Sequence, residues 1–295
     1  MKKTNSQRRL IEIFGYSPFD TSQQARKFWK LNACPFIGQA CGKYDHTKTI
    51  CYGTCAVSWK DSSVIICPNR LYEKDYKTIK RVANDAFGDI PFMFFQEYIS
   101  RQNEDCVVAL GHNSGKEVSL KNMSMDWVLA KIIDNTLIEY VGIEVQSIDI
   151  TGNYRDAWYA ARDGETVCPP SEHGLNWANV HKRLIPQLIR KGLIYSRSSL
   201  VKKGLYFILP DSVYTKFEEI LGSDIPQVEN ASADTLTVHT YTLTGEPPEG
   251  EMRALEEKRT LRFELDELSM RFVSGPNLPS AEILDNKIKE LLAVR

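Results

Sequence analysis

Two strand-like runs separated by a short polar turn constrain the fold of this chain more than any other stretch. The runs are Met125–Asp134 and Leu137–Ile150, and Asn135 and Thr136 lie between them. Apolar and β-branched runs of this length around a polar turn are typical of two antiparallel strands. The sequence therefore predicts a β-hairpin near the middle of the chain.

Polar residues on this hairpin predict a divalent-metal site. Side chains alternate between the faces of a strand, so Glu144 and Gln146 share one face and Val145 points into the core. Asp126, near the start of the first run, then lies opposite them. Mg²⁺ binds one or two carboxylates together with substrate oxygens and water, so Asp126, Glu144 and the Val145 carbonyl are candidate ligands. Gln146 would orient a water or hold a phosphate oxygen while a phosphodiester bond is hydrolysed. The competing interpretation is a pair of solvated acids on an edge strand.

A polar loop precedes the hairpin at Gly111–Val118. Glu117 in this loop could reach the metal site from a neighbouring strand, which makes it a further catalytic candidate. A solvated turn explains the loop equally well. Four of its side chains could contact phosphates or bases: His112, Asn113, Ser114 and Lys116.

Five of the seven cysteines fall within Cys34–Cys67. Four thiolates from neighbouring loops form a tetrahedral site for Zn²⁺ or for a single iron ion. The expected ligands, each beside a residue that favours a turn, are Cys34, Cys41, Cys55 and Cys67, with Cys51 as a fifth candidate. The alternative is that some of these thiols are small buried apolar groups.

Composition limits where a charged partner can bind. The 295 residues contain 37 Lys and Arg against 38 Asp and Glu, so the net charge is −1 and any basic surface must be local. The chain has no apolar run of transmembrane length and no secretory signal, so we expect a cytoplasmic protein that does not bind a membrane.

One local basic surface is evident. From Val180 to Lys203 the chain has no acid but seven basic residues, the pattern expected where a protein meets a phosphate backbone. The start of a helix near Asn153 and Arg155 also suits an anion, although capping by Asn153 and a salt bridge of Arg155 are the plainer explanations. The candidates for contact with DNA are Asn153, Arg155, His173, Asn176, Lys182 and Arg183.

The remaining elements follow from periodicity and from helix start and stop signals. A helical pattern at residues 71–87 is expected to pack on the sheet that contains the hairpin. The terminal helix, residues 281–294, carries an apolar face that suits a core or a dimer. Other expected helices are residues 5–14, 21–31 and 213–221, and other expected strands are residues 107–111, 205–209 and 236–243.

Several of these stretches in the same order resemble the NotI family of type II restriction endonucleases. The resemblance covers roughly residues 5–210. The residues that carry it are Cys34-Pro-Phe, Cys41-x-Lys, Gly-Thr-Cys55, Ile-Cys67-Pro-Asn-Arg70, Gly115-Lys-Glu-Val, Met125-Asp-Trp, Gly142-Ile-Glu-Val-Gln146-Ser-Ile-Asp149, Asn176-Trp-Ala-Asn-Val, Lys182-Arg183 and Pro186-Gln187.

The resemblance implies an α/β (α+β) protein with a PD-(D/E)XK restriction-nuclease core, in which a mixed central sheet is flanked by helices. Residues 1–72 would hold N-terminal helices and the four-cysteine metal-binding region, and residues 73–295 the nuclease core with DNA-recognition and dimerisation elements. Asp126 and Glu144 would bind Mg²⁺, and Gln146 would occupy the position where such nucleases usually carry lysine. Cys34, Cys41, Cys55 and Cys67 would bind iron.

The resemblance also implies partners and a substrate. A homodimer would cut both strands of double-stranded DNA at a GC-rich palindrome, with CGGCCG as a candidate site, and leave 5′ overhangs. A cognate DNA methyltransferase would protect the host DNA. Two other functions fit parts of the sequence: a metal-stapled regulatory protein that binds DNA without cutting it, and a redox protein that uses the iron.

Overall fold

The centre of the molecule is a mixed seven-stranded sheet in the order β16-β15-β14-β11-β10-β7-β6. The computed structural model describes residues 8–60, 62–101, 104–120, 123–165, 169–275 and 280–292. Pairing is parallel for β6 with β7, for β11 with β14 and for β14 with β15, and antiparallel elsewhere. The strands are β6 (Phe92–Phe94), β7 (Cys106–Gly111), β10 (Trp127–Ile133), β11 (Thr136–Val145), β14 (Leu205–Pro210), β15 (Thr235–Leu243) and β16 (Leu255–Glu264).

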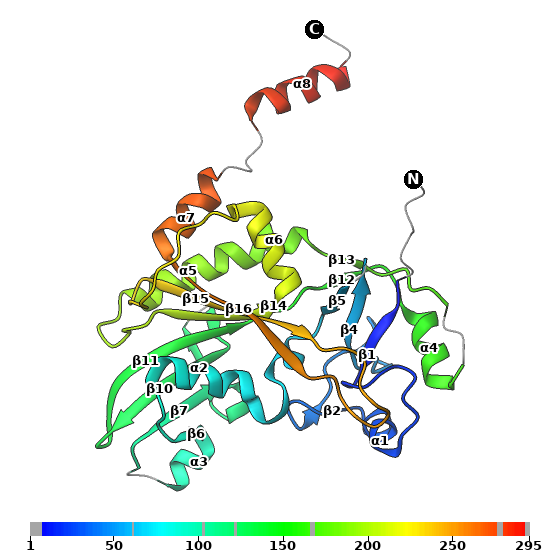
Figure 1. The fold of residues 1–295 in the computed structure, drawn as a ribbon, viewed down its shortest axis with the longest axis horizontal. Helices are drawn as coiled ribbons and strands as arrows, with labels where there is room; N and C mark the ends of the chain where they lie inside the picture. The colour runs from blue at the N-terminus through cyan, green and yellow to red at the C-terminus, as the bar shows by residue number, and fades with distance from the viewer. Residues whose placement is uncertain are drawn as a thin grey trace.

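Helices cover both faces of this sheet (Figure 1). In β14, Leu205 and Phe207 face a core cluster shared with α5 (Ile185–Ser196), α6 (Asp211–Leu221) and α7 (Leu265–Ser274). Tyr206 and Ile208 face the opposite cluster, shared with α2 (Lys77–Phe87). Neighbouring residues of a strand point to opposite faces, so a fully apolar strand suits a sheet that is covered by helices on both faces. The expected mixed sheet flanked by helices is confirmed.

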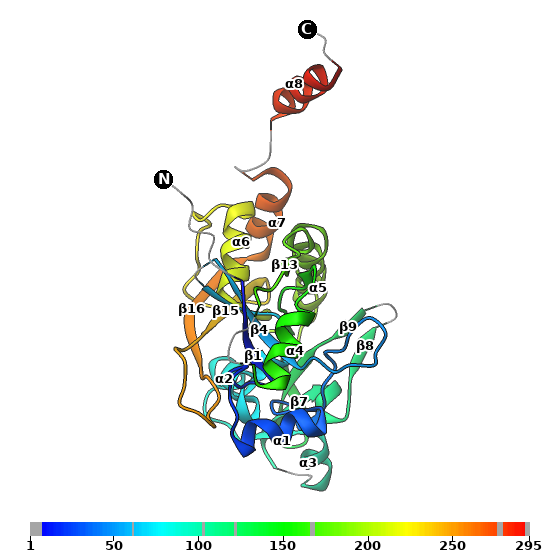
Figure 2. The same ribbon diagram turned by 90° about the vertical axis from the view of Figure 1, so that its right-hand side faces the viewer.

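A smaller antiparallel sheet, β1 (Leu10–Ile13), β4 (Thr54–Trp59) and β5 (Ser62–Ile65), lies beside the large one (Figure 2). Its buried side chains contribute to the same two core clusters as the large sheet. The other elements of the chain are α1 (Gln23–Leu31), β2 (Ala33–Cys34), β3 (Gln39–Ala40), α3 (Phe95–Ser100), β8 (Val118–Leu120), β9 (Met123–Met125), β12 (Ile150–Thr151), α4 (Arg155–Asp163), β13 (Gly174–Leu175) and short helical turns at Pro68–Tyr72, Lys74–Tyr76, His112–Ser114 and Val180–Leu184.

Most expected elements are present with shifted ends, and one is wrong. Of the helix expected at residues 5–14, residues 5–7 lie outside the described residues, and Leu10–Ile13 form the strand β1, whose four residues are all buried. A run without a polar face gives no periodicity by which a helix can be told from a strand. The helical pattern of residues 71–87 contributes an α-helix only from Lys77 onward, and it packs on the sheet as expected.

The terminal helix α8 (Ala281–Leu292) has no buried residue, and Figure 1 shows it standing away from the sheet. A core position, one of its two expected explanations, is therefore wrong. Its apolar side chains, Ile283, Leu284, Ile288 and Leu291, are all exposed. Within the described ranges, no helix is long and apolar enough to cross a membrane.

A fully buried ion pair joins β1 of the small sheet to the turn Pro68–Tyr72, and the same arginine also bonds the segment before β16 of the large sheet. Arg70 follows Cys67, and its Nε donates to Glu12 Oε2 of β1 at 2.9 Å with neither side chain exposed. Arg70 Nη2 also donates to the carbonyl of Arg253, before β16, at 2.5 Å. The guanidinium lies over the Phe36 ring, 4.7 Å from its centroid. Burial raises the pKa of Glu12, and the charge of Arg70 opposes that change.

Arg70→Met should lower the free energy of unfolding by about 3–5 kcal/mol, because it leaves the buried Glu12 charge without a partner. Arg81→Met is the control, since Arg81 pairs with Glu257 at the surface and such pairs contribute at most about 1 kcal/mol. Urea unfolding of both variants measures the difference. Equal small losses would show that the Glu12–Arg70 pair does not hold the sheets together.

Candidate active site

The hairpin brings Asp126 and Glu144 together. Trp127 pairs with Ile143 in the β10–β11 register, so Asp126, just before β10, lies beside the end of β11. Asp126 Oδ2 accepts a hydrogen bond from the Val145 backbone N–H at 2.8 Å. The pairing of the two runs and the inward direction of Val145, both expected from the sequence, are confirmed.

The two carboxyl groups lie in a poorly solvated place. Burial raises the pKa of Glu144 to about 8, with a further contribution from the nearby charge of Asp126. Burial also raises the pKa of Asp126, while its hydrogen bond from Val145 works in the opposite direction. A site that makes two neighbouring carboxylates costly to ionise favours a bound cation.

One cation already reaches this pair from α5. Lys191 Nζ donates to Glu144 Oε2 at 2.5 Å, and the exposed fractions of the two side chains are 13% and 5%. Sequence reasoning placed Lys191 in the basic run and missed this contact. The available signal was Gly142, two residues before Glu144, because a glycine inside a strand often marks the close approach of another element.

A small cavity of about 100 Å³ opens beside Asp126. Glu117 lines it, and its charge contributes to the raised pKa of Asp126, so the loop before β8 does reach the site. The other residues around the cavity are Tyr72, His112, Asn113, Met125 and Trp127. Gln146 follows directly after β11, where its backbone N–H donates to the Ile208 carbonyl at 3.0 Å.

The residues at this site fit a hard divalent cation. Lys191 donates to Glu144 Oε2, and in the described chain no N–H group or hydroxyl reaches the buried Oε1. The Glu144 carboxyl group, when protonated, donates a hydrogen bond to Asp126. Two carboxyl groups that share one proton suit Mg²⁺, which would replace that proton and keep several waters. In the described part of the chain, no three His, Cys, Asp or Glu side chains are arranged to hold a metal ion.

The five cysteines between β2 and the turn at Pro68–Tyr72 are all buried and lie near one another. Cys41 and Cys51 form a hydrogen bond, which raises the pKa of Cys41 and lowers the pKa of Cys51. Burial raises the pKa of the Cys34 thiol to about 11 and also raises the pKa values of Cys55 and Cys67.

Backbone N–H groups near four of these sulfurs favour the thiolate form. That of Lys43 donates to Cys41 Sγ at 3.4 Å. The N–H groups of Phe36 and Ile37 oppose the rise in the pKa of Cys34, those of Asn69 and Arg70 oppose the rise in the pKa of Cys67, and that of Gly53 helps to lower the pKa of Cys51. Cys55 instead donates its S–H to the Gly53 carbonyl. A thiophilic ion needs thiolates, but in the described chain these cysteines are not arranged to hold a metal ion, so the four-cysteine site stays a prediction.

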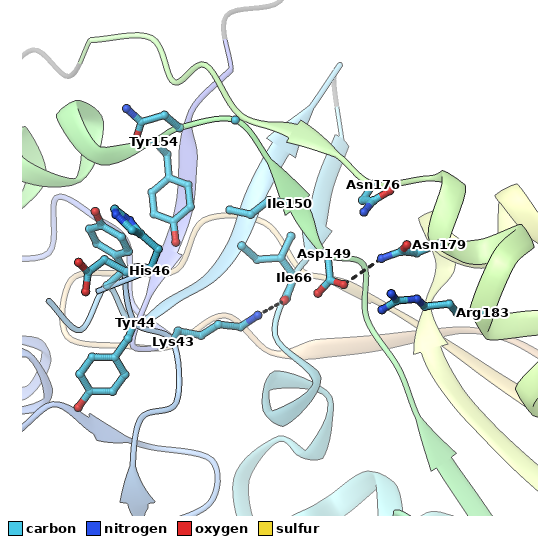
Figure 3. Close-up of a pocket in the computed structure, with 14 residues that line it drawn as sticks. Lys43, Tyr44, His46, Ile66, Asp149, Ile150, Tyr154, Asn176, Asn179 and Arg183 are labelled. Carbon is cyan, nitrogen blue, oxygen red and sulfur yellow. Dashed lines mark hydrogen bonds between the residues drawn. The ribbon is translucent and has the colours of Figure 1, made fainter. Parts of the chain in front are cut away.

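A larger polar cavity of about 670 Å³ lies between the cysteine loops and the segment after β11 (Figure 3). Lys43, Tyr44 and His46 line one side, and Asn176 and Arg183 line the other. Asp149 in the cavity wall accepts from the Asn179 side chain at 3.1 Å.

The six candidate DNA contacts lie in three kinds of place: the wall of the larger cavity, the exposed surface and the protein interior. Asn153, Asn176 and Arg183 line the larger cavity, and Lys182, which precedes Arg183 in the sequence, is exposed. Arg155 is exposed and pairs with Asp156 at 3.4 Å. Asn153 Oδ1 accepts from the Arg155 backbone N–H at 2.8 Å, which is the capping role that had been the plainer explanation.

His173 does not fit its predicted role. It is fully buried, with Nε2 bonded to the Ser58 carbonyl at 2.8 Å and Nδ1 bonded to Ser171 Oγ at 2.7 Å. Both ring nitrogens are therefore used inside the protein, where they join β4 to the segment before β13. The corrected interpretation is a structural histidine.

The acid-free basic run is only partly a surface. Lys191 binds Glu144, and Lys203 donates to the Ala86 carbonyl of α2. The other five basic residues of the run are exposed: Lys182, Arg183, Arg190, Arg197 and Lys202.

Comparison with known proteins adds no assignment to this geometry. No protein family matches the chain, and no curated protein is similar to it at a significant level.

The raised pKa of Glu144 predicts how stability depends on pH. The native state keeps a proton on Glu144 between its ordinary pKa of 4.5 and about 8, whereas the unfolded state loses it. The free energy of unfolding should therefore fall across this window as pH rises, by at most about 1.4 kcal/mol per pH unit. Glu144→Gln should remove this slope. Urea unfolding of both proteins without divalent ions tests it, and equal slopes would contradict the assignment to Glu144.

Proposed function

We propose that the chain is a Mg²⁺-dependent type II restriction endonuclease, a site-specific deoxyribonuclease that hydrolyses phosphodiester bonds in double-stranded DNA. The observation that carries this proposal is the adjacent pair of carboxyl groups, Asp126, which is half-buried, and Glu144, which is buried and has no N–H or hydroxyl donor to its Oε1. The raised pKa values of both groups and the polar cavity beside Asp126 support it. A solvated pair of surface acids would have none of these properties.

The roles of the residues follow from their positions. Asp126 and Glu144 would hold the metal, with the Val145 carbonyl as a third candidate ligand. When bound there, Mg²⁺ supplies charge for the attacked phosphate and a more acidic water. The hydrogen bond from the Val145 N–H keeps Asp126 turned toward the site. Glu117 would bind a water at the open side of the cavity, and Gln146 would orient a water or a phosphate oxygen.

The order of elements around the site agrees with a PD-(D/E)XK core. The carboxylates lie on an antiparallel hairpin inside a mixed sheet, and a parallel strand, β14, pairs with the second hairpin strand. Helices cover both faces of the sheet. This arrangement and the sequence resemblance to the NotI family support the same interpretation.

DNA would bind along the larger polar cavity and the exposed part of the basic run. The cavity offers amide groups at Asn153 and Asn176 and a guanidinium at Arg183, groups that can hydrogen-bond base edges or phosphates. A palindromic site is read by a two-fold symmetric protein, so we propose a homodimer on a GC-rich palindrome such as CGGCCG. A cognate methyltransferase would protect the same sequence in the host.

The cysteine cluster would hold one structural iron or zinc ion in four of its five thiolates. Backbone N–H groups favour the thiolates of Cys34, Cys41 and Cys67, which supports three of the four expected ligands, and Cys51 shares this feature whereas Cys55 does not. Because the loops with Lys43, Tyr44 and His46 line the larger cavity, the metal would fix one wall of the DNA-binding surface.

Digestion of sequenced plasmid DNA with Mg²⁺ should give discrete fragments with wild-type protein. Asp126→Asn and Glu144→Gln should each lower the cleavage rate at least about 100-fold, roughly 3 kcal/mol of activation free energy, because each removes a metal ligand. Glu139→Gln is the matched control on the same strand, where Glu139 pairs with Lys131 away from the carboxylates. Specific binding without cleavage in any divalent metal would instead indicate the regulatory protein.

Cys67→Ser should lower the bound iron or zinc, measured by elemental analysis per chain, from about one ion to well below one, and should reduce the melting temperature, because structural metal sites contribute folding free energy. Cys106→Ser is the control, since Cys106 is equally buried but lies in β7 outside the cluster. Unchanged metal content in the Cys67 variant would refute the site.

A further inference from the structure

Close packing of α5 on β11 brings a lysine to the carboxylates. Tyr140, Gly142 and Glu144 share one face of β11, and Lys191 and Tyr195 lie four residues apart on one face of α5. A side chain at Gly142 would meet the Tyr195 ring, because an added Cβ would lie only 2.2 Å from it. The rings of Tyr140 and Tyr195 are 6.0 Å apart. The bare backbone at Gly142 thus lets the helix approach and sets Lys191 over Glu144.

Lys191 makes the two oxygens of the Glu144 carboxylate different from each other. Its Nζ donates to Oε2 at 2.5 Å, while no N–H group or hydroxyl in the described chain reaches the buried Oε1, and Asp126 lies near enough to share a proton with the Glu144 carboxyl group. A divalent cation that replaces the proton on Glu144 would meet two carboxylates and one ammonium, a trio with a net negative charge. Lysine has three N–H donors, and in the described part of the chain Nζ bonds only Glu144. Two donors therefore remain for a water or a phosphate oxygen.

The strand itself offers no such cation. Gln146 lies two residues beyond Glu144, a spacing that puts both side chains on one side of an extended chain, but its amide carries no charge. A phosphate under attack gains negative charge, and a fixed ammonium beside it stabilises that charge far better than an amide.

We propose that Lys191 supplies, from α5, the ammonium group of the active site, which contacts both Glu144 and the scissile phosphate. This inference rests on the proposed phosphodiester hydrolysis. The hairpin provides the carboxylates of the site, and α5 would provide the cation that the hairpin lacks.

The test compares single and double variants in the plasmid digest. Lys191→Met keeps the length and apolar stem of the side chain but removes its charge, and should lower the cleavage rate about 100-fold. Adding Gln146→Lys places an ammonium after the strand near the same carboxylate. The double variant should cut at least about tenfold faster than Lys191→Met. Arg190→Met is the matched control, since Arg190 is the exposed neighbour on the same helix, and should change the rate less than about threefold.

Calorimetric binding of Ca²⁺ to the DNA-free protein gives a second readout that needs no cleavage. Removing the ammonium leaves both carboxylates uncompensated, so Lys191→Met should bind Ca²⁺ several-fold more tightly although it cuts more slowly. A lysine that only supports the local structure would weaken binding and cleavage together. If Lys191→Met does not fold, Lys191→Arg, which keeps the charge, should fold and retain cleavage within about tenfold.

The outcomes separate this inference from the proposed function. A wild-type chain that cuts DNA, with a Lys191→Met variant that cuts equally well, overturns the role of Lys191 alone. A folded double variant no faster than Lys191→Met also overturns it. A wild-type chain that cuts no DNA in any divalent metal removes the proposed function and the role of Lys191 with it.

Discussion

The buried Arg70 side chain links the cysteine-bearing part of the chain to the large sheet, because it pairs with Glu12 of β1 and bonds the Arg253 carbonyl just before β16. A guanidinium removed from water is stable only when protein groups replace its contacts with solvent. For Arg70 these groups are Glu12 of β1, the Phe36 ring near Cys34 and the carbonyl of Arg253. Arg70 itself follows Cys67 by three residues, so the position of one thiol depends on this pair. The cysteine loops and the sheet are therefore one packed structure, and the polar cavity between the loops and the segment after β11 is formed by both.

The parts of the fold that follow from sequence are those with a clear pattern. The hairpin, β14 and β15 are apolar runs between turns, and α1 and α6 have polar and apolar faces in helical order. The pattern fails at Leu10–Ile13, where Glu12 points into the core with the apolar residues around it. A buried charge of this kind becomes intelligible only when its partner, 58 residues later, is known. The prediction for α8 fails for the opposite reason. Its sequence has an apolar face, but no part of the described chain covers that face.

The candidate site divides in the same manner. Asp126 and Glu144 could be predicted because strand alternation and a short turn relate them locally. The places of Lys191 and His173 could not, since a lysine in a basic run and a histidine near a loop resemble surface residues in sequence. Their contacts with Glu144 and Ser58 span 47 and 115 residues. Charge patterning therefore identifies the basic segment but cannot tell which of its cations turn inward.

The separation of Lys191 from Glu144 along the chain also bears on the order of folding. The β10–β11 hairpin closes over a short loop, whereas α5 must dock before Lys191 reaches Glu144, and contacts between distant residues form more slowly. During synthesis on the ribosome, the carboxylates emerge before the helix that carries the ammonium. Under the proposed function, this order would keep a partly folded chain inactive, and the nascent protein would gain activity only after α5 has docked.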